Sequence, residues 1–411
     1  MASMTVLNVM DRQLLAVLIE PIKHDLGVSD AAMGLLTGTS FALLHAIATI
    51  PIARWADRGV RRSIIAGGLA LWSGLTLLTG LARNFAEIFA IRVGVGIGEA
   101  TGGAPAQSLL SDFFPQERRA TALAVLVMGG PLGSMVAFAG GGWLAESHGW
   151  RMAFFVFGVP GILLALAIRT TLPEPRRGAT EHVPLPPSES LSLGRSLRFL
   201  WALPSFRHLV LACTFNSAGI YAVMIWAVPY LMRIHAMSNT EAGLRLAIGS
   251  ALFTALGTLA AGPISDRLGM YDIRWLVWLP AITSAAVAPF AWGFAFAPSA
   301  AMASLLLAPA SFLAGTYFGP LYSALQSVAP PHMRALAPAC AAMGNTVLGL
   351  GLAPPLLGWL TDIWTPGLGA EAIRYSLSVM LLVHFAAAAH LLLAGRTLRA
   401  DLHVKGGSIP D

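Results

Sequence analysis

Apolar segments long enough to cross a lipid bilayer recur along the whole chain. A membrane-spanning helix needs roughly 20 consecutive, mostly apolar residues, and the sequence contains twelve such segments. They cover residues 4–20, 30–53, 63–82, 85–110, 120–144, 151–170, 207–231, 242–264, 273–296, 300–326, 335–360 and 373–394. Charged residues make up only 11% of the 411 positions, whereas a soluble domain carries about 25%. The sequence therefore predicts an all-α integral membrane protein with twelve transmembrane helices.

The distribution of Lys and Arg predicts the orientation of these helices. With the N-terminus in the cytoplasm, eighteen of the 26 basic residues fall on the cytoplasmic side, six fall on the other side, and Arg12 and Arg92 fall inside spans. Cytoplasmic loops of membrane proteins carry an excess of basic residues. We therefore expect both termini in the cytoplasm and the protein in the cell (inner) membrane. The net charge of +6 is an orientation signal rather than a nucleic-acid-binding surface.

The N-terminus lacks the basic region and the small-residue cleavage site of a signal peptide. We therefore expect the first apolar segment to stay in the protein. Because this segment is short, we also expect the natural chain to begin further upstream.

One polar stretch divides the spans six and six. Residues 173–206 are rich in Pro, Ser and charged side chains, which is typical of a linker. The predicted domains are an N-terminal six-helix bundle, a cytoplasmic linker, a C-terminal six-helix bundle and a cytoplasmic tail, at residues 1–172, 173–206, 207–396 and 397–411.

Three short motifs occur once in each half. WADR at 55–58 matches ISDR at 264–267, and GWLAE at 142–146 matches GWLTD at 358–362. Between them, Pro115 and Arg119 match Pro330 and Arg334. The offsets of 209, 216 and 215 residues indicate two homologous halves. We expect a pseudo-twofold axis along the membrane normal and a cavity between the halves.

Several motifs resemble those of the major facilitator superfamily. ARWADRGVRR (53–62) and GPISDRLGMYDIR (262–274) are similar to its signature loop in its two usual positions. GGPLG (129–133) resembles its Gly-Pro motif of the fifth span, and Arg92 in IRVGVGIGEA stands where the fourth span carries an Arg.

Within that superfamily the chain resembles the spinster-like branch. The resemblance is carried by NVMDR (8–12), GIGEA (96–100) and FFPQERRATALA (113–124). Animal members of that branch are associated with export of sphingosine-1-phosphate and lysophospholipids. The resemblance implies proton-linked transport that involves Asp11, Arg92 and Glu99.

These three residues are also the ionisable groups that physical reasoning selects. A charge in hydrocarbon is costly unless it is paired or lines a water-filled cavity. Arg92 and Glu99 are seven residues apart and share one helix face, at about −20° of rotation. At about 1.5 Å of rise per residue, Asp11 and Arg92 lie at similar depth and Glu99 lies about 10 Å further in. Arg92 can therefore pair with either carboxylate.

Two alternative interpretations accompany the charged residues. Asp11, Arg92 and Glu99 could form a static salt bridge that holds helices together. Arg12 points about 100° away from Asp11, which favours a local role in the helix bundle. His45 is interpreted as a packing residue, and no role is assigned to His384 or His390.

The second half carries almost no charge inside its spans, and we expect it to supply the apolar part of a substrate site. Together with Arg92 and Glu99, the predicted substrate-binding residues are Phe215, Tyr221, Trp226, Tyr317, Tyr322 and Asn345. Aromatic side chains suit an amphiphile better than a sugar, which would require more hydrogen-bonding groups.

The repeated loop motif predicts a cytoplasmic gate. Its charged residues are Asp57, Arg58, Asp266 and Arg267. Simple anchoring at the membrane surface would explain them, but their equivalent positions in both halves favour a latch that closes the outward-open state.

The sequence predicts a proton-coupled secondary transporter that works by alternating access. Its expected partners are protons, the bilayer and an amphiphilic or anionic substrate, and we expect a monomer with no cofactor, metal or nucleic acid. The alternatives are a small organic-anion symporter, a multidrug efflux transporter and a non-transporting lipid receptor. A membrane enzyme is disfavoured because no H-E-x-x-H motif or activated nucleophile is found, and Cys213 and Cys340 indicate neither a disulfide framework nor a metal site.

Overall fold

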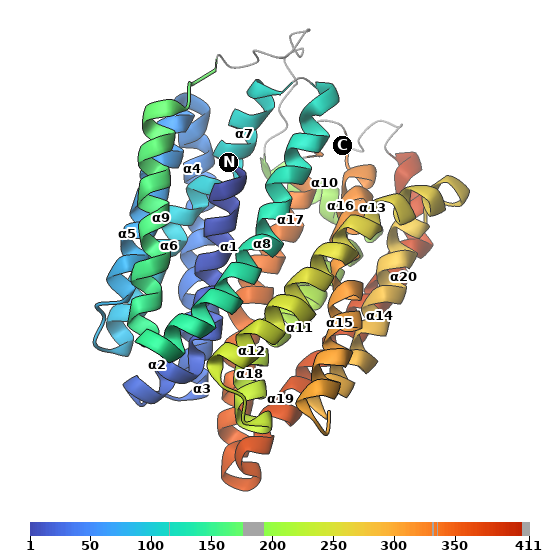
Figure 1. Cartoon of the computed structure of the whole chain (residues 1–411). Helices are drawn as coiled ribbons and strands as arrows, with labels where there is room; N and C mark the ends of the chain where they lie inside the picture. The colour runs from blue at the N-terminus through green and yellow to red at the C-terminus, as the bar shows by residue number, and fades with distance from the viewer. Residues whose placement is uncertain (115, 176–192, 331–332, 335, 405–411) are drawn as a thin grey trace. The chain divides into compact units, whose positions relative to one another are not determined.

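The computed structural model describes residues 1–404 with gaps at 115, 176–192, 331–332 and 335. Helices connected by turns make up the regular structure of this described part, and it contains no strand (Figure 1). The expectation of an all-α chain is therefore confirmed. Most of the predicted linker and the end of the predicted tail lie outside the described residues.

The helices follow the apolar segments of the sequence. Up to residue 171 they are α1 (Ala2–Val17), α2 (Ile19–Leu26), α3 (Asp30–Gly34), η1 (Leu35–Thr39), α4 (Ser40–Arg58), α5 (Arg61–Thr79), α6 (Phe85–Glu99), η2 (Ala100–Gly102), α7 (Ala104–Phe113), α8 (Gln116–His148) and α9 (Trp150–Thr171). From residue 193 they are α10 (Leu193–Ala202), α11 (Pro204–His235), α12 (Asn239–Leu246), η3 (Ala247–Leu252), α13 (Phe253–Tyr271), α14 (Trp275–Ala295), α15 (Ala300–Gly315), α16 (Phe318–Val328), α17 (Leu336–Gly344), η5 (Asn345–Leu350), α18 (Gly351–Leu368), η6 (Gly369–Glu371), α19 (Ala372–Leu381) and α20 (Val383–Val404).

Many of these helices are long and apolar enough to cross a membrane. Among the described residues, eight continuous helical stretches meet that requirement, or nine if α1 and α2, which meet at 53°, form one bent span. One of these stretches, residues 336–402, contains two of the predicted segments. The multi-span character is thus confirmed, and the number of twelve spans stays a prediction.

The chain forms two compact units. Unit 1 contains residues 1–184, 224–251 and 354–373, and unit 2 contains residues 185–223, 252–353 and 374–411. The predicted six-helix bundles, residues 1–172 and 207–396, are defined by sequence halves and not by these units. Their boundaries stay a prediction.

Close helix contacts in unit 1 depend on glycine. Gly133 of the GGPLG motif lies in α8 against the backbone of α1, and a Cβ atom at this position would overlap the carbonyl oxygen of Val6. Small residues of this kind allow helix backbones to approach each other closely within a membrane. The GGPLG motif therefore allows α8 to pack closely against α1 at Gly133.

Unit 2 has an apolar core and buried polar groups. The core includes Leu200 and Leu325, which are fully buried. Next to this core, the amide oxygen of Asn216 accepts a hydrogen bond from the Ser284 hydroxyl (2.9 Å) and lies 3.0 Å from Nδ1 of His384. His384, to which the sequence assigned no role, is only 1% exposed and is a core residue of this unit.

Candidate functional site

Helix α6 carries two of the predicted charges, and its local sequence explains where they lie. The side chain of Asn84 caps its first turn. Further along the helix, a Cβ atom at Gly96 would lie 2.6 Å from the carbonyl oxygen of Phe41, and one at Gly98 would lie 2.9 Å from the Cβ atom of Trp72. The glycines thus bring α6 into close contact with α4 and α5. This packing leaves Arg92 and Glu99 of α6 buried among helices of unit 1.

Arg92 forms a buried ion pair with Asp11. Nη1 of Arg92 donates to Oδ2 of Asp11 at 2.8 Å, and the hydroxyl of Thr76 in α5 donates to Oδ1 at 2.6 Å. Asp11 is 3% and Arg92 is 1% exposed. Both carboxylate oxygens therefore have donors, as a buried charge requires. The sequence-based depth placed these two residues level with each other, and the structure brings them into contact.

Glu99 is held by a different cation. Its Oε2 atom accepts hydrogen bonds from Nε of Arg12 and from Nδ2 of Asn8, both at 2.7 Å. The other oxygen, Oε1, is buried and has no hydrogen-bond partner among the described residues. The side chain of Arg12 is 27% exposed, whereas that of Glu99 is fully buried. Solvent can therefore reach the Glu99–Arg12 pair at the guanidinium but not at the carboxylate.

Phe41 lies next to both guanidinium groups. Cζ of Arg12 lies 4.4 Å and Cζ of Arg92 lies 6.0 Å from the centroid of its ring. A cation over an aromatic face is attracted by the ring quadrupole. His45 stacks on the same ring at 4.9 Å, and its Nδ1 lies 3.1 Å from the carbonyl oxygen of Gly96. The His45 ring is therefore packed and hydrogen-bonded, as the sequence-based interpretation held.

The sequence-based selection missed Arg12, Asn8 and Thr76 as members of this site. Arg12 was assigned a local role because it points away from Asp11. The sequence did contain a signal for Asn8 and Arg12, because these residues are four apart and share one face of α1. That face meets Glu99, which lies deeper along α6 than Arg92.

The aromatic residues predicted to bind substrate occupy several environments. Phe215 stacks on His390 at 5.6 Å within unit 2. Trp226 is fully buried in unit 1 and donates to the carbonyl oxygen of Pro354 at 3.1 Å, whereas Tyr317 is fully buried in the core of unit 2. Tyr221 and Tyr322 of unit 2 are partly exposed. A role in substrate binding stays a prediction for all of them.

Asn345 opens a π-helical turn, η5, in unit 2. Its Oδ1 atom is buried and has no hydrogen-bond partner among the described residues. Such π-helical turns are frequent at functional sites. The role of Asn345 as a substrate-binding residue stays a prediction.

The predicted cytoplasmic gate is only partly described. Arg58, Asp266 and Arg267 are exposed, and the side chain of Asp57 lies outside the described part of the structure. The latch between these residues and other helices therefore stays a prediction.

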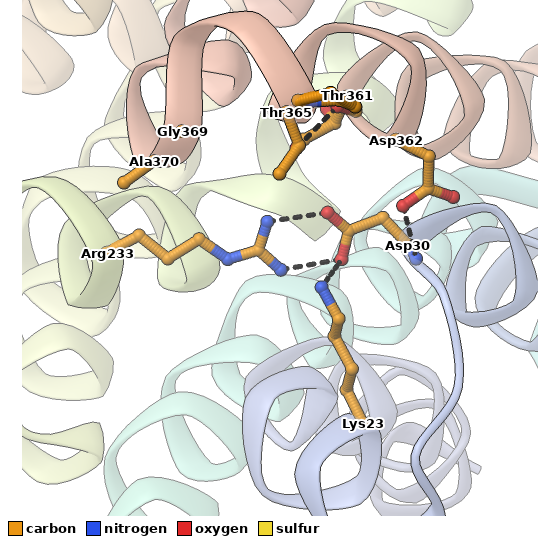
Figure 2. A pocket seen from close by; sticks show the side chains of 9 residues that line it. Lys23, Asp30, Arg233, Thr361, Asp362, Thr365, Gly369 and Ala370 are labelled. Carbon is orange, nitrogen blue, oxygen red and sulfur yellow. Dashed lines mark hydrogen bonds and ion pairs between the residues drawn. The ribbon is translucent and has the colours of Figure 1, made fainter.

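A second group of charged residues connects α2 and the first residue of α3 with α11 (Figure 2). Arg233 of α11 donates to both oxygens of Asp30, at 2.6 and 2.7 Å, and to Oε1 of Glu20. Nζ of Lys23 lies 2.5 Å from Asp30, which is 1% exposed. These four residues, Glu20, Lys23, Asp30 and Arg233, are called the Asp30 cluster below. A two-pronged contact between Arg and a carboxylate is a strong, geometrically specific interaction.

The Asp30 cluster borders a cavity. The cavity has a volume of about 310 Å³ and is lined by Lys23, Asp30, Arg233 and, from α18, Thr361 and Asp362. Figure 2 shows Asp362 turned toward the backbone of Asp30. Its two carboxylate oxygens accept from the backbone N–H groups of Asp30 and Ala31, at 3.0 and 2.8 Å. Asp362 therefore caps the first turn of α3.

The same contact occurs a second time at an equivalent place. Glu146 of α8 accepts from the backbone N–H of Thr240 at 3.0 Å, in the first turn of α12. Glu146 and Asp362 are 216 residues apart and end the motifs GWLAE and GWLTD, and Ala31 and Thr240 are 209 residues apart. The two repeated motifs of the sequence thus form two matching helix caps in unit 1. The sequence predicted the repeat but gave no indication of this contact.

The glycine of each motif permits the approach. A Cβ atom at Gly358 would overlap the carbonyl oxygen of Asp30, and one at Gly142 would lie 2.6 Å from that of Asn239. Asn239 is the counterpart of Asp30 by the offset of 209 residues. The crossing of α3 and α18 therefore has an ion cluster at Asp30, whereas the crossing of α8 and α12 has the neutral amide of Asn239 at the matching position.

Comparison with known proteins identifies the family of the chain. A model of the Major Facilitator Superfamily matches residues 1–354. The chain belongs to the Major Facilitator Superfamily. It is also similar to an "MFS-type efflux pump" of Mycolicibacterium smegmatis, with 35% identity over 376 residues, which cover 91% of this chain and 86% of the relative.

The spinster-like resemblance is confirmed as well. Human "Protein spinster homolog 1" is 26% identical over 429 residues, covering 97% of this chain and 81% of the human protein. A crystal structure of a bacterial homologue of the human lysosomal transporter Spinster, in an inward-facing and unoccupied conformation, matches with a TM-score of 0.89 at 30% identity and covers 97% of this chain and 96% of that chain. The chain is therefore a spinster-like secondary transporter of the superfamily, a multi-pass protein of the cell membrane and not an enzyme.

Proposed function

We propose that the protein is a proton-coupled transporter in which Asp11 and Glu99 share proton binding. The observation that supports this most directly is the presence of two acid–base pairs around one aromatic ring, with one carboxylate oxygen of Glu99 left without a hydrogen-bond partner among the described residues. A static structural bridge would need one pair with both oxygens bonded. A carboxylate with a free oxygen next to a partly exposed cation is a better proton acceptor.

The proposed coupling step begins at Glu99. Protonation removes the charge that holds Arg12, so the guanidinium is released toward the open side of the pair. A guanidinium stays protonated and binds carboxylate or phosphate in a two-pronged geometry. Arg12 is then the first cation to meet an anionic headgroup. Arg92, which the sequence suggested for this role, is buried and bonded to Asp11.

The proposed substrate is an amphiphile with a charged headgroup, of the sphingoid or lysophospholipid type. The similarity to spinster homologues supports this class. The aromatic residues Phe215, Tyr221 and Tyr322 are proposed to contact its apolar part, and the amide of Asn345 is proposed to bind a polar group of the substrate. Export of drug-like compounds is the second candidate, because the bacterial relative with 35% identity is named an efflux pump. An organic-anion symporter is a further alternative.

Alternating access requires a gate at each end of the transport path. With both termini in the cytoplasm, the Asp30 cluster and the two helix caps are proposed to lie at the outer surface and to close the transport path there. Asp57, Arg58, Asp266 and Arg267 are proposed to form the opposite latch when the outer side opens. The moving parts are proposed to be the bundles 1–172 and 207–396.

Flux through purified protein in liposomes tests the coupling step. Wild-type protein is expected to move a lysophospholipid, a sphingoid base or a drug-like cation faster when a pH gradient is imposed. Glu99→Gln keeps the hydrogen-bond geometry but cannot titrate, so we expect its flux to become independent of pH while the folded fraction is unchanged. Unchanged pH dependence in Glu99→Gln would refute the role of Glu99. Saturable binding of a compound without flux would exclude that compound as the transported substrate.

A further inference from the structure

Two histidine side chains face each other where α11 and α20 meet in unit 2. Nδ1 of His208 lies 2.9 Å from Nδ1 of His390. The ring centroids are 5.2 Å apart, which is close to the distance between the two nitrogens plus the radii of both rings, so each Nδ1 points directly at the other. Both residues are partly exposed. The contact is therefore a hydrogen bond that protons from solvent can reach.

A hydrogen bond between two imidazole nitrogens requires one proton between them. A neutral imidazole carries N–H on one nitrogen and a lone pair on the other, so one ring of the pair has Nδ1–H and the other has a bare Nδ1. A proton added at Nε2 of the donor ring makes it an imidazolium and leaves the bond in place as a stronger, charge-assisted bond. A further proton on the acceptor ring occupies its Nδ1 and breaks the bond.

Phe215 favours His390 as the ring that carries the charge. It lies two turns from His208 on the same face of α11, and its ring is stacked on His390 with the centroids 5.6 Å apart and the planes 5° apart. A cation over an aromatic face is attracted by the ring quadrupole. An imidazolium at His390 is thus stabilised on one side by Phe215 and on the other by the bond to His208.

The charges around the pair oppose a second proton. Arg207 is adjacent to His208 in the chain, and Arg207, Arg198 of α10 and Arg396 of α20 are exposed cations. The acid Asp401 of α20 is buried and already hydrogen-bonded to the first turn of α11. Neither imidazole has an acidic partner among the residues that the structure describes. Two positive rings would therefore repel each other without compensation.

We propose that His208 and His390 form a proton-binding site that fastens α11 to α20. One added proton is held between the rings and strengthens the contact, and a second proton opens it. His208 lies about one turn from Pro204, the first residue of α11. In the predicted orientation this is the cytoplasmic end of the span, so the site takes its protons from the cytoplasm. It shares no residue with the site of Asp11 and Glu99 and does not rest on the proposed coupling.

Nitrogen NMR on the full-length protein in phosphatidylcholine nanodiscs tests the bond directly. With 15N-labelled histidine, and with His208→Leu and His390→Leu to assign the two rings, we expect magnetisation transfer between the two Nδ1 nuclei and an Nδ1–H tautomer on one ring. On acidification the rings should become charged in two steps, about tenfold or more apart in proton concentration, with His390 first. In His208→Leu the transfer should disappear and His390 should titrate in a single step. Two Nε2–H tautomers without transfer at any pH would overturn the proposal, and so would charging of both rings in one step.

The reactivity of Cys213 tests the opening by the second proton. Cys213 of α11 is fully buried and belongs to the same core as Leu391, the neighbour of His390. In a Cys340→Ala background, we expect a pyridyl disulfide, which stays reactive in acid, to label Cys213 several-fold faster in the wild type than in His390→Leu at acidic pH, and at similar rates in both at neutral pH. His148→Gln, which removes an exposed histidine of α8, is the matched control and should behave as the wild type. The same ratio of rates at both pH values would show that the pair does not open the contact.

Discussion

The two carboxylates of the coupling site, Asp11 and Glu99, neutralise cations that differ in their exposure to solvent. Asp11 neutralises Arg92, which is 1% exposed and has no other acidic partner among the described residues. Glu99 neutralises Arg12, whose side chain is 27% exposed and can be hydrated. Loss of charge at Asp11 therefore strands a buried cation, while loss of charge at Glu99 does not. The Asp11–Arg92 pair is therefore the more stable pair, and of the two carboxylates proposed to share proton binding, Glu99 is the one whose protonation costs less.

This difference predicts a large loss of stability in Asp11→Asn. Breaking a buried pair by removing one partner costs about 3–5 kcal/mol, because an uncompensated charge remains. We expect the free energy of unfolding, measured by denaturant titration in detergent micelles, to fall by that amount. Glu99→Gln should lose much less.

The double variant Asp11→Asn/Arg92→Met serves as the control for this prediction. It removes the stranded cation and should recover a large part of the loss. If Asp11→Asn unfolds at the same denaturant concentration as the wild type, Arg92 has another way to be compensated and the assignment of the stable pair is wrong.

At the level of helices, the two caps in unit 1 are equivalent in position but unequal in strength. Asp362 accepts from two backbone N–H groups, while Glu146 accepts from one. The cap at Asp362 is also reinforced by the Asp30 cluster, in which Arg233 holds two carboxylates. The crossing of α3 and α18 should therefore resist opening more than the crossing of α8 and α12.

Cysteine labelling can measure this inequality. Thr361 lines the cavity and is 1% exposed, so a Thr361→Cys thiol should react slowly with a membrane-impermeant maleimide. Every 1.4 kcal/mol lost by the closed state raises the open population about tenfold. We expect Arg233→Gln to raise the labelling rate most, and Asp362→Ala, which removes a cap of about 0.5–2 kcal/mol, to raise it less.

Glu146→Ala is the matched variant at the other crossing and should have the smallest effect on the labelling rate. Equal rates in all three variants would show that the Asp30 cluster does not hold this end closed. A thermal unfolding measurement on each variant separates opening from general loss of stability.

For the whole molecule, the sequence predicted the fold class and the repeat, because hydropathy and the spacing of motifs are properties of the chain itself. The pairing of Asp11 with Arg92 was within reach for the same reason, since depth follows from helix rise. The pairing of Glu99 with Arg12 was not, because it depends on which face of α1 meets α6. The helix caps formed by Glu146 and Asp362 could not be predicted either, because they depend on tertiary packing. Asp362, for example, lies 332 residues from Asp30, whose N–H it accepts.

The two caps predict a requirement for transport by the whole molecule. In alternating access, the halves of the sequence must separate at both crossings in every cycle. A disulfide in Ala31→Cys/Asp362→Cys, or in Glu146→Cys/Thr240→Cys, should therefore abolish flux in liposomes, and reduction should restore it. Asp25→Cys/Arg151→Cys is the matched control. It replaces an ion pair of 2.7 Å within the N-terminal half and should leave flux intact when oxidised. Full flux through protein cross-linked at either crossing would contradict the outer gate, because the path would then open without separating these helices.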